Sequence, residues 1–239
     1  MLLYIYSHIA IVFVDRSCTD TAILVFARHP EDEARHKNWL GARRHRANTT
    51  LASRLFRSIC SEAHATGLPV FVIDSTRQQG QSFGERFHHA ITTVFAAGFD
   101  KVITVGSDCP FLRSHHLLQA ASRLDEGLVL GPDHRGGVYL MAIDRKTFDE
   151  ADLLNIHWQT PVVLKELMQL ATVNLLTRLH DLHSLQDIQR LLARIRKPSG
   201  LQWLLSFLIQ ASDQKNLPEL PHTRYMNRVH IRRGPPVLA

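Results

Sequence analysis

Asp108 is the residue of this chain that is best placed to do chemistry. It lies in a tight Gly-Ser-Asp-Cys-Pro turn directly after the apolar stretch Lys101–Val105, which is typical of a buried strand. Ligands of open parallel sheets bind beyond the carboxyl ends of the strands. A carboxylate there can hold Mg²⁺ or Mn²⁺ against the oxygens of a diphosphate. The same aspartate could instead cap the following turn or helix, and the sequence leaves both interpretations open.

A second candidate is the glycine pair Gly136–Gly137, which precedes the apolar stretch Val138–Ile143. Paired glycines let a ligand approach the backbone closely, although a simple turn also explains them. The sequence contains no P-loop, no G-x-G-x-x-G fingerprint and no G-x-S-x-G elbow. A Walker ATPase and an ordinary dinucleotide-dependent dehydrogenase therefore lose their main support.

Histidines and cysteines give weaker signals. The adjacent pairs His88–His89 and His115–His116 would point about 100° apart on a helix, so neither pair forms a chelate by itself. Three cysteines, Cys18, Cys60 and Cys109, show no C-x-x-C spacing and cannot all pair within one chain. The sequence therefore predicts neither a zinc ribbon nor a disulfide framework, and it favours a reducing compartment.

The elements that must position these candidates alternate along the first half of the chain. Short β-branched stretches predict buried strands, and apolar residues spaced three or four apart predict helices. The expected strands are Ile9–Val14 or Ala22–Phe26, Val70–Ile73 and Lys101–Val105. The expected helices are Thr49–Ala65, Phe83–Ala97 and Ser114–Leu124, the last with Ser114 as its N-cap. This βαβαβα order favours a parallel sheet covered by helices on both faces.

The second half predicts an antiparallel or mixed edge of the same sheet. Strands are expected over 127–130, 138–143 and 173–176, and helices over 161–170, 184–196 and 201–209. From about residue 212 the chain is basic, contains prolines and has no periodicity. We therefore expect a single domain over residues 1–211, with 1–20 as an extension, and a C-terminal tail over residues 212–239.

The composition restricts the class of protein and of partner. The chain has 239 residues, 45% of them hydrophobic, and a formal net charge of +6, which is typical of a globular domain with a polyanionic partner such as a phosphate or nucleotide. No apolar run approaches the roughly 20 residues that span a bilayer, and the N-terminus lacks the features of a signal peptide. We expect a cytoplasmic protein. Nucleic acid is the less favoured partner, because no basic stretch is interleaved with aromatic residues.

Five segments in this order resemble a known family. They read A-I-L-V-F-A-R-H-P at 22–30, Q-Q-G-Q-S-F-G-E-R-F at 78–87, V-G-S-D-C-P at 105–110, G-P-D-H-R-G-G-V-Y-L at 131–140 and I-H-W-Q-T-P at 156–161. Together they are similar to the glycosyltransferase-A-like (GT-A-like) proteins related to the phospholactate guanylyltransferases. The resemblance implies an α/β, Rossmann-like nucleotide-diphospho-sugar transferase fold, with three layers around a mixed, mostly parallel sheet.

The resemblance also implies a role for individual residues. In the family's pattern, the residues that line or border the base and phosphates correspond here to Ala27, Arg28, Gln78, Gly80, Arg86 and Ser107. Asp108 would be a catalytic metal ligand, and Lys37, which matches a lysine of the family's first loop, would neutralise charge. Asp181 and His183 lie where the family has a late D-x-D and would complete the metal site. The acceptor side would comprise Gly136, Gly137, Trp158 and Thr160.

Several residues depart from the family's pattern. The acidic run Glu31–Glu33 would repel phosphate unless its side chains point outward. Arg135 replaces an acidic residue before the glycine pair, and Asp133 could take over the lost role. His183 replaces the second aspartate of the D-x-D, and a histidine suits Mn²⁺ better than Mg²⁺.

The leading hypothesis is a transferase that depends on Mg²⁺ or Mn²⁺ and uses a nucleoside diphosphate sugar or nucleoside triphosphate. Glycosyl and nucleotidyl transfer to an unknown small-molecule acceptor both remain open. The departures support an alternative, a nucleotide-binding or interaction protein that has the same fold and no catalysis. Nucleic-acid binding through the basic segments is a third hypothesis, and it predicts affinity that falls steeply with salt.

Overall fold

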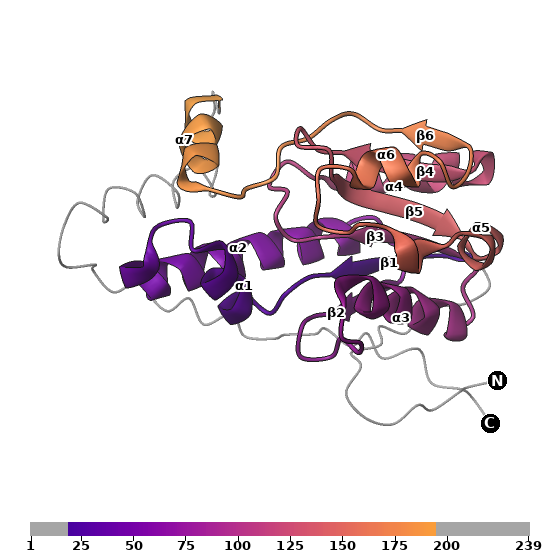
Figure 1. Cartoon of the computed structure of the whole chain (residues 1–239), viewed down its shortest axis with the longest axis horizontal. Helices are drawn as coiled ribbons and strands as arrows, with labels where there is room; N and C mark the ends of the chain where they lie inside the picture. Colours follow the sequence, from indigo (N-terminus) through magenta and orange to yellow (C-terminus); the bar gives the residue numbers. More distant parts are fainter. Residues whose placement is uncertain (1–18, 195–239) are drawn as a thin grey trace, which may run out of the picture.

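The computed structural model describes residues 19–194, which form a six-stranded sheet between helices. The strands are β1 (Thr21–Phe26), β2 (Val70–Ile73), β3 (Lys101–Val105), β4 (Leu128–Pro132), β5 (Val138–Asp144) and β6 (Val173–Leu175). Their order in the sheet is β2-β1-β3-β5-β4-β6, with β2 at the lower edge and β6 at the upper edge of Figure 1. β5 runs antiparallel to β3 and β4, and the other neighbouring strands are parallel. The predicted α/β fold with a mixed, mostly parallel sheet is confirmed.

The helices between residues 19 and 194 are α1 (Pro30–Lys37), α2 (His45–His64), α3 (Phe83–Ala96), α4 (Ser114–Arg123), α5 (Arg145–Glu150), α6 (Val163–Leu167) and α7 (Leu185–Arg194). Short 3₁₀ helices lie at Ala42–Arg44, Leu124–Glu126 and Leu153–Asn155. Not one of these helices is both long and apolar enough to cross a membrane.

Alternation along the strands produces the three layers. In β1, Ala22, Leu24 and Phe26 pack toward α3, while Ile23 and Val25 pack toward α2 and α4. Successive side chains of a strand point to opposite faces, so a continuous apolar strand such as β1 is buried on both sides. α3, α5 and α6 therefore cover one face of the sheet, and α2 and α4 cover the other.

A third apolar cluster joins segments that are far apart in the sequence. Trp39, which follows α1, packs with Leu51 of α2, with Leu182 and with Ile188 of α7. The indole Nε1–H of Trp39 donates to the carbonyl oxygen of Leu182 at 2.9 Å. This cluster holds residues 179–183 beside α1.

The structure departs from the sequence-based expectation at several elements. No helix was expected between Phe26 and Thr49, although Pro30 at the first turn of α1, acidic residues 31–33 and basic residues 35–37 are the charge pattern of a short helix. α2 begins at His45 instead of Thr49, and α5 was not expected. Ser114 is the first residue of α4 and not its N-cap. Its backbone N–H donates to Glu62 Oε2 at 2.9 Å, and Arg113 occupies the cap position.

Some features of the sequence analysis lie outside the described residues. These are the strand Ile9–Val14, Cys18, the end of the helix 184–196, the helix 201–209 and the tail 212–239. The extension over residues 1–20, of which only residues 19 and 20 are described, and the domain boundary at residue 211 therefore stay predictions.

Candidate functional site

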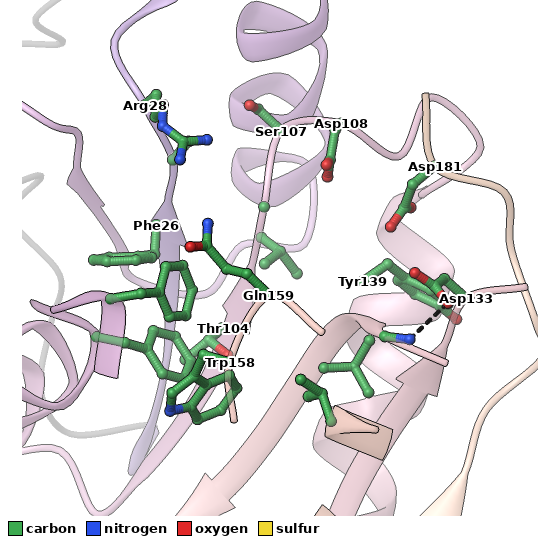
Figure 2. Close-up of a pocket in the computed structure, with 18 of the residues that line it drawn as sticks. Phe26, Arg28, Thr104, Ser107, Asp108, Asp133, Tyr139, Trp158, Gln159 and Asp181 are labelled. Carbon is green, nitrogen blue, oxygen red and sulfur yellow. Dashed lines mark hydrogen bonds between the residues drawn. The ribbon is translucent and has the colours of Figure 1, made fainter. Parts of the chain in front are cut away.

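A cavity of about 470 Å³ lies beyond the carboxyl ends of β1 and β3 (Figure 2). These two strands are parallel neighbours, so both chains leave the sheet at the same edge. The predicted site residues that line the cavity are Ala27, Arg28, Lys37, Gln78, Arg86, Ser107, Asp108, Gly137, Trp158, Thr160, Asp181 and His183. Ligand sites of open α/β sheets lie at this edge.

Gly80 and Gly136 are the two predicted site residues that are not among the lining residues. Gly80 has a φ of +127°, and an added Cβ would lie 2.7 Å from the Cβ of Glu85. Gly136 has a φ of +87°, and an added Cβ would lie 2.0 Å from the carbonyl oxygen of Pro161. Each glycine thus shapes a loop at the border of the cavity.

Asp108, Asp181 and His183 form a cluster that could hold a cation. One ligand atom of each side chain lies within 4.8 Å of those of the other two. Asp108 comes from the turn after β3, and its carbonyl oxygen accepts from the backbone N–H of Leu182 at 2.8 Å. This bond and the Trp39 contact fix the segment from which Asp181 and His183 project.

The cluster meets the chemical requirements of a divalent cation site. Asp181 Oδ1 and His183 Nε2 are buried and have no hydrogen-bond partner within residues 19–194, and a buried polar atom without a partner costs about 1–3 kcal/mol. Burial and the nearby Lys37 ammonium lower the pKa of His183, which favours the neutral imidazole that binds metals. Burial and the carboxylates of Asp108 and Asp133 raise the pKa of Asp181. A bound cation would satisfy both atoms and relieve the repulsion between the carboxylates.

Lys37 already supplies one positive charge to this cluster. Its Nζ lies 3.0 Å from Asp108 Oδ2 and 2.9 Å from His183 Nδ1, and its side chain is only 11% exposed. Burial alone would raise the pKa of Asp108, but the Lys37 ammonium outweighs this effect and holds that pKa below its usual value.

Asn48 of α2 holds the loop that places Lys37 at the end of α1. Its Nδ2 donates to Asn38 Oδ1 at 3.1 Å and to the carbonyl oxygen of Gly41 at 3.2 Å, and its Oδ1 accepts from the backbone N–H of Leu40 at 2.9 Å. Asn48 itself is 1% exposed. The loop after α1 is therefore fixed by one buried side chain.

Replacing Asn48 with alanine is expected to lower the free energy of unfolding by about 2–3 kcal/mol, because buried backbone groups lose their partners. Urea denaturation measures this change. Thr49→Ala, which removes a partly exposed hydroxyl that bonds to His45 of the same helix, is the control and should change stability by less than about 0.5 kcal/mol. Equal effects of the two substitutions would contradict the role assigned to Asn48.

The acidic residues of α1 do not all face the cavity. Glu31 and Asp32 pair with Arg35 on the exposed side of the helix, and Asp32 also accepts from the hydroxyl of Ser75. Glu33 is buried, lines the cavity and lies 3.3 Å from the guanidinium of Arg28. Burial and the carboxylate of Asp108 raise the pKa of Glu33. The expected repulsion of phosphate thus comes from a single residue.

The side chain of Gln78 stabilises the end of β1 by hydrogen bonds. Its Nε2 donates to the carbonyl oxygen of Ala27 at 2.9 Å and to that of Ile73 at 3.3 Å. Arg86 of α3 donates to the carbonyl oxygen of Gln81 at 2.7 Å, which shapes the loop before that helix. Both side chains therefore position loops that line the cavity.

Asp133 and Arg135 also have structural partners. Asp133 Oδ1 accepts from the backbone N–H groups of Arg135 at 2.6 Å and Gly137 at 2.8 Å, so it closes its own turn. Asp133 lies outside the cluster of three possible ligands. The guanidinium of Arg135 lies 2.8 Å from both oxygens of Asp187, whose carboxylate accepts from the backbone N–H of His183. Arg135 thus links the β4–β5 turn to the segment that holds His183.

Aromatic side chains form a wall at the other end of the cavity. Phe26, Phe83, Phe87 and Trp158 pack on one another with ring centroids 5.0–5.7 Å apart. Figure 2 shows Phe26 and Trp158 on one side and Asp108 and Asp181 on the other. Of this group, only Trp158 was a predicted site residue, although the i, i+4 pair Phe83 and Phe87 marks one apolar stripe on α3.

Comparisons with known proteins identify the fold of this chain. The structure is similar to a crystal structure of a "putative nucleotide-diphospho-sugar transferase" from Desulfovibrio desulfuricans G20, with a TM-score of 0.68 and 19% identity over 84% of this chain and 100% of that one. The chain thus has the nucleotide-diphospho-sugar transferase fold. Residues 46–160 match the family described as "Uncharacterized protein conserved in bacteria (DUF2064)". The predicted resemblance to GT-A-like proteins of unknown function is confirmed.

A more distant likeness is to Rv0371c of Mycobacterium tuberculosis H37Rv, whose structure was solved as a complex with manganese. That likeness has a TM-score of 0.42 and 17% identity over 74% of this chain and 100% of that one, which is too low to bear on the site. No curated protein matches the chain.

Proposed function

We propose that this protein is a metal-dependent transferase that uses a nucleotide-activated donor. The observation that carries the proposal is the cluster of Asp108, Asp181 and His183, in which two buried ligand atoms have no hydrogen-bond partner in the described part of the chain. The cluster lies at the ligand-binding edge of a nucleotide-diphospho-sugar transferase fold. Mg²⁺ and Mn²⁺ both suit two carboxylates, and the histidine favours Mn²⁺.

The charged residues of the cavity each have a role in this proposal. Asp108, Asp181 and His183 would hold the cation, which when bound neutralises the charge of the donor's phosphates. Lys37 and Arg28 both line the cavity and would supply further positive charge to the phosphates. Gln78 holds the end of β1, beside which the base and ribose would lie. The acceptor would enter past Trp158.

Glycosyl and nucleotidyl transfer use the same arrangement of charges. In both reactions a metal and cationic side chains stabilise a phosphate-linked leaving group. They differ in the bond that the acceptor attacks, either at the sugar carbon or at the α-phosphorus. Both reactions therefore fall within the proposed class.

Calorimetric titration tests the proposal. Nucleoside diphosphates, nucleoside triphosphates and nucleoside diphosphate sugars are titrated with and without Mn²⁺ into the full chain, its Asp108→Asn variant and a control, Asp149→Asn, which changes an exposed aspartate of α5. We expect metal-dependent binding of one nucleotide class that Asp108→Asn weakens about 100-fold or more and the control leaves unchanged.

Two outcomes would contradict this expectation. Nucleotide binding that needs neither Mn²⁺ nor Asp108 would support the alternative, a nucleotide-binding protein without catalysis, which the position of Lys37 inside the cluster also favours. An absence of binding across the panel would exclude a nucleotide-activated donor.

A further inference from the structure

The two ends of the cavity differ in chemistry. The charged end carries Lys37 and the Asp108–Asp181–His183 cluster. The opposite end is the wall of Phe26, Phe83, Phe87 and Trp158, of which Phe83 and Trp158 are only partly buried and line the cavity. Val138 of β5 is also partly buried and adds an aliphatic side chain to the lining. Figure 2 shows Phe26 and Trp158 apart from the carboxylates of Asp108 and Asp181. A ligand that fills the cavity therefore meets two different environments.

Apart from the exposed amide of Gln159, which also lines the cavity (Figure 2), the polar side chains beside this wall direct their hydrogens into the protein. The indole Nε1–H of Trp158 donates to the carbonyl oxygen of Leu153 at 2.9 Å. The hydroxyl of Thr104 donates to the carbonyl oxygen of Met141 at 2.9 Å, and that of Tyr139 donates to the carbonyl oxygen of Thr177 at 2.8 Å. The hydroxyl of Thr160 likewise donates to the carbonyl oxygen of His157. The wall thus offers mainly ring faces and aliphatic surface.

We propose that this wall binds the apolar body of the acceptor, an aliphatic or aromatic group that carries one polar reacting group, and that it disfavours a carbohydrate. This inference rests on the proposed function, because the reacting group would point to the charged end. A sugar placed here would bury hydroxyls without partners, and each such hydroxyl lowers affinity by roughly fivefold to a hundredfold. The base and ribose of the donor would lie beside the end of β1, next to Gln78, which leaves Phe83 and Trp158 to the acceptor.

The choice between an apolar and a carbohydrate occupant can be measured without metal or nucleotide. Saturation-transfer NMR is recorded on the full chain with 4-phenylbutan-1-ol and, separately, with methyl α-glucopyranoside. We expect 4-phenylbutan-1-ol to bind at least about tenfold more tightly, because its phenyl and methylene groups gain apolar contacts at the wall. Equal affinities, or tighter binding of the glucoside, would overturn the proposal.

Two variants locate this binding on the apolar lining of the cavity. Trp158→Ala should weaken binding of 4-phenylbutan-1-ol about tenfold by removing a ring face. Since Trp158 also packs on Gly84 and α3, Val138→Thr provides a second variant of nearly equal shape, which should weaken binding about threefold to fivefold by adding a hydroxyl. The matched control is Val162→Thr, at an exposed valine outside the cavity. Unchanged binding in a folded Val138→Thr variant would refute the assignment.

The Asp108→Asn variant separates this inference from the proposed function. It should lose metal-dependent nucleotide binding and keep its affinity for 4-phenylbutan-1-ol within about twofold. If no nucleotide binds even the unaltered chain but 4-phenylbutan-1-ol still binds at Trp158 and Val138, the proposed function fails and the apolar site stands. If nucleotide binds and 4-phenylbutan-1-ol does not, the proposed function stands and the apolar site fails.

Discussion

Replacing Lys37 with methionine is expected to tighten Mn²⁺ binding at the Asp108–Asp181–His183 cluster by roughly tenfold to a hundredfold. The ammonium of Lys37 lies 3.0 Å from one ligand side chain and 2.9 Å from another. Two unit charges 4 Å apart interact by about 4 kcal/mol at the effective dielectric constant of a protein surface. Because a flexible lysine can withdraw from an arriving cation, only part of that energy opposes metal binding.

Methionine fills much of the volume of the lysine stem without its charge. Electron paramagnetic resonance of Mn²⁺ reports the free ion and gives the affinity without any assay of turnover. Lys146→Met, which makes the same change at an exposed lysine of α5, should leave the affinity within about twofold. Unchanged or weaker Mn²⁺ binding in Lys37→Met would show that Lys37 does not compete for the cluster.

This measurement also bears on the two functional hypotheses. If the unaltered chain binds Mn²⁺ weakly and the variant binds it well, Lys37 takes the place of the cation and the chain resembles the non-catalytic alternative. If both bind Mn²⁺ and the nucleotide then binds less tightly to the variant, Lys37 serves the donor's phosphates. The same side chain thus reports on metal binding and on phosphate binding.

The strands of the sheet were predicted closely from the sequence. β2 and β3 begin and end at the predicted residues, because both are short apolar runs that are bounded by polar turns. The sequence did not predict α1, because this helix buries only Glu33 and Ala34 and has no apolar stripe. Its signal lies in the charges at its two ends.

The candidate site was predicted in part. Asp108 could be found because strand, turn and helix are consecutive in the sequence. The contact between Lys37 and His183 joins residues that are 146 positions apart, and no local pattern predicts that distance. It depends on the packing of Trp39, Leu51 and Leu182 in the cluster beside α1. The aromatic wall is likewise formed by residues on separate elements, among them Phe26, Phe83 and Trp158.

The β4–β5 turn is expected to be the part of the site least tolerant of substitution, and Gly136→Ala should lower the free energy of unfolding by about 4 kcal/mol. An alanine Cβ at this position would lie 2.0 Å from the carbonyl oxygen of Pro161, in a backbone with a φ of +87°. The carbonyl oxygen of Gly136 also accepts from the backbone N–H of Leu164 at 2.9 Å. Relief of the clash would therefore pull apart two loops that border the cavity.

Gly67→Ala separates the effect of the clash from that of the backbone. Gly67 has a φ of +76°, and no atom of residues 19–194 lies within 4 Å of an added Cβ, so alanine there meets only the conformational penalty of about 1 kcal/mol. The difference between the two variants in urea denaturation, about 3 kcal/mol, measures the contact between Gly136 and Pro161. Equal losses of stability would show that the left-handed backbone alone explains the glycine. A larger loss of stability at Gly136 would show that the β4–β5 turn and the loop over residues 156–161 depend on each other. If the folded Gly136→Ala protein also binds 4-phenylbutan-1-ol more weakly, Gly136 positions the wall without lining the cavity.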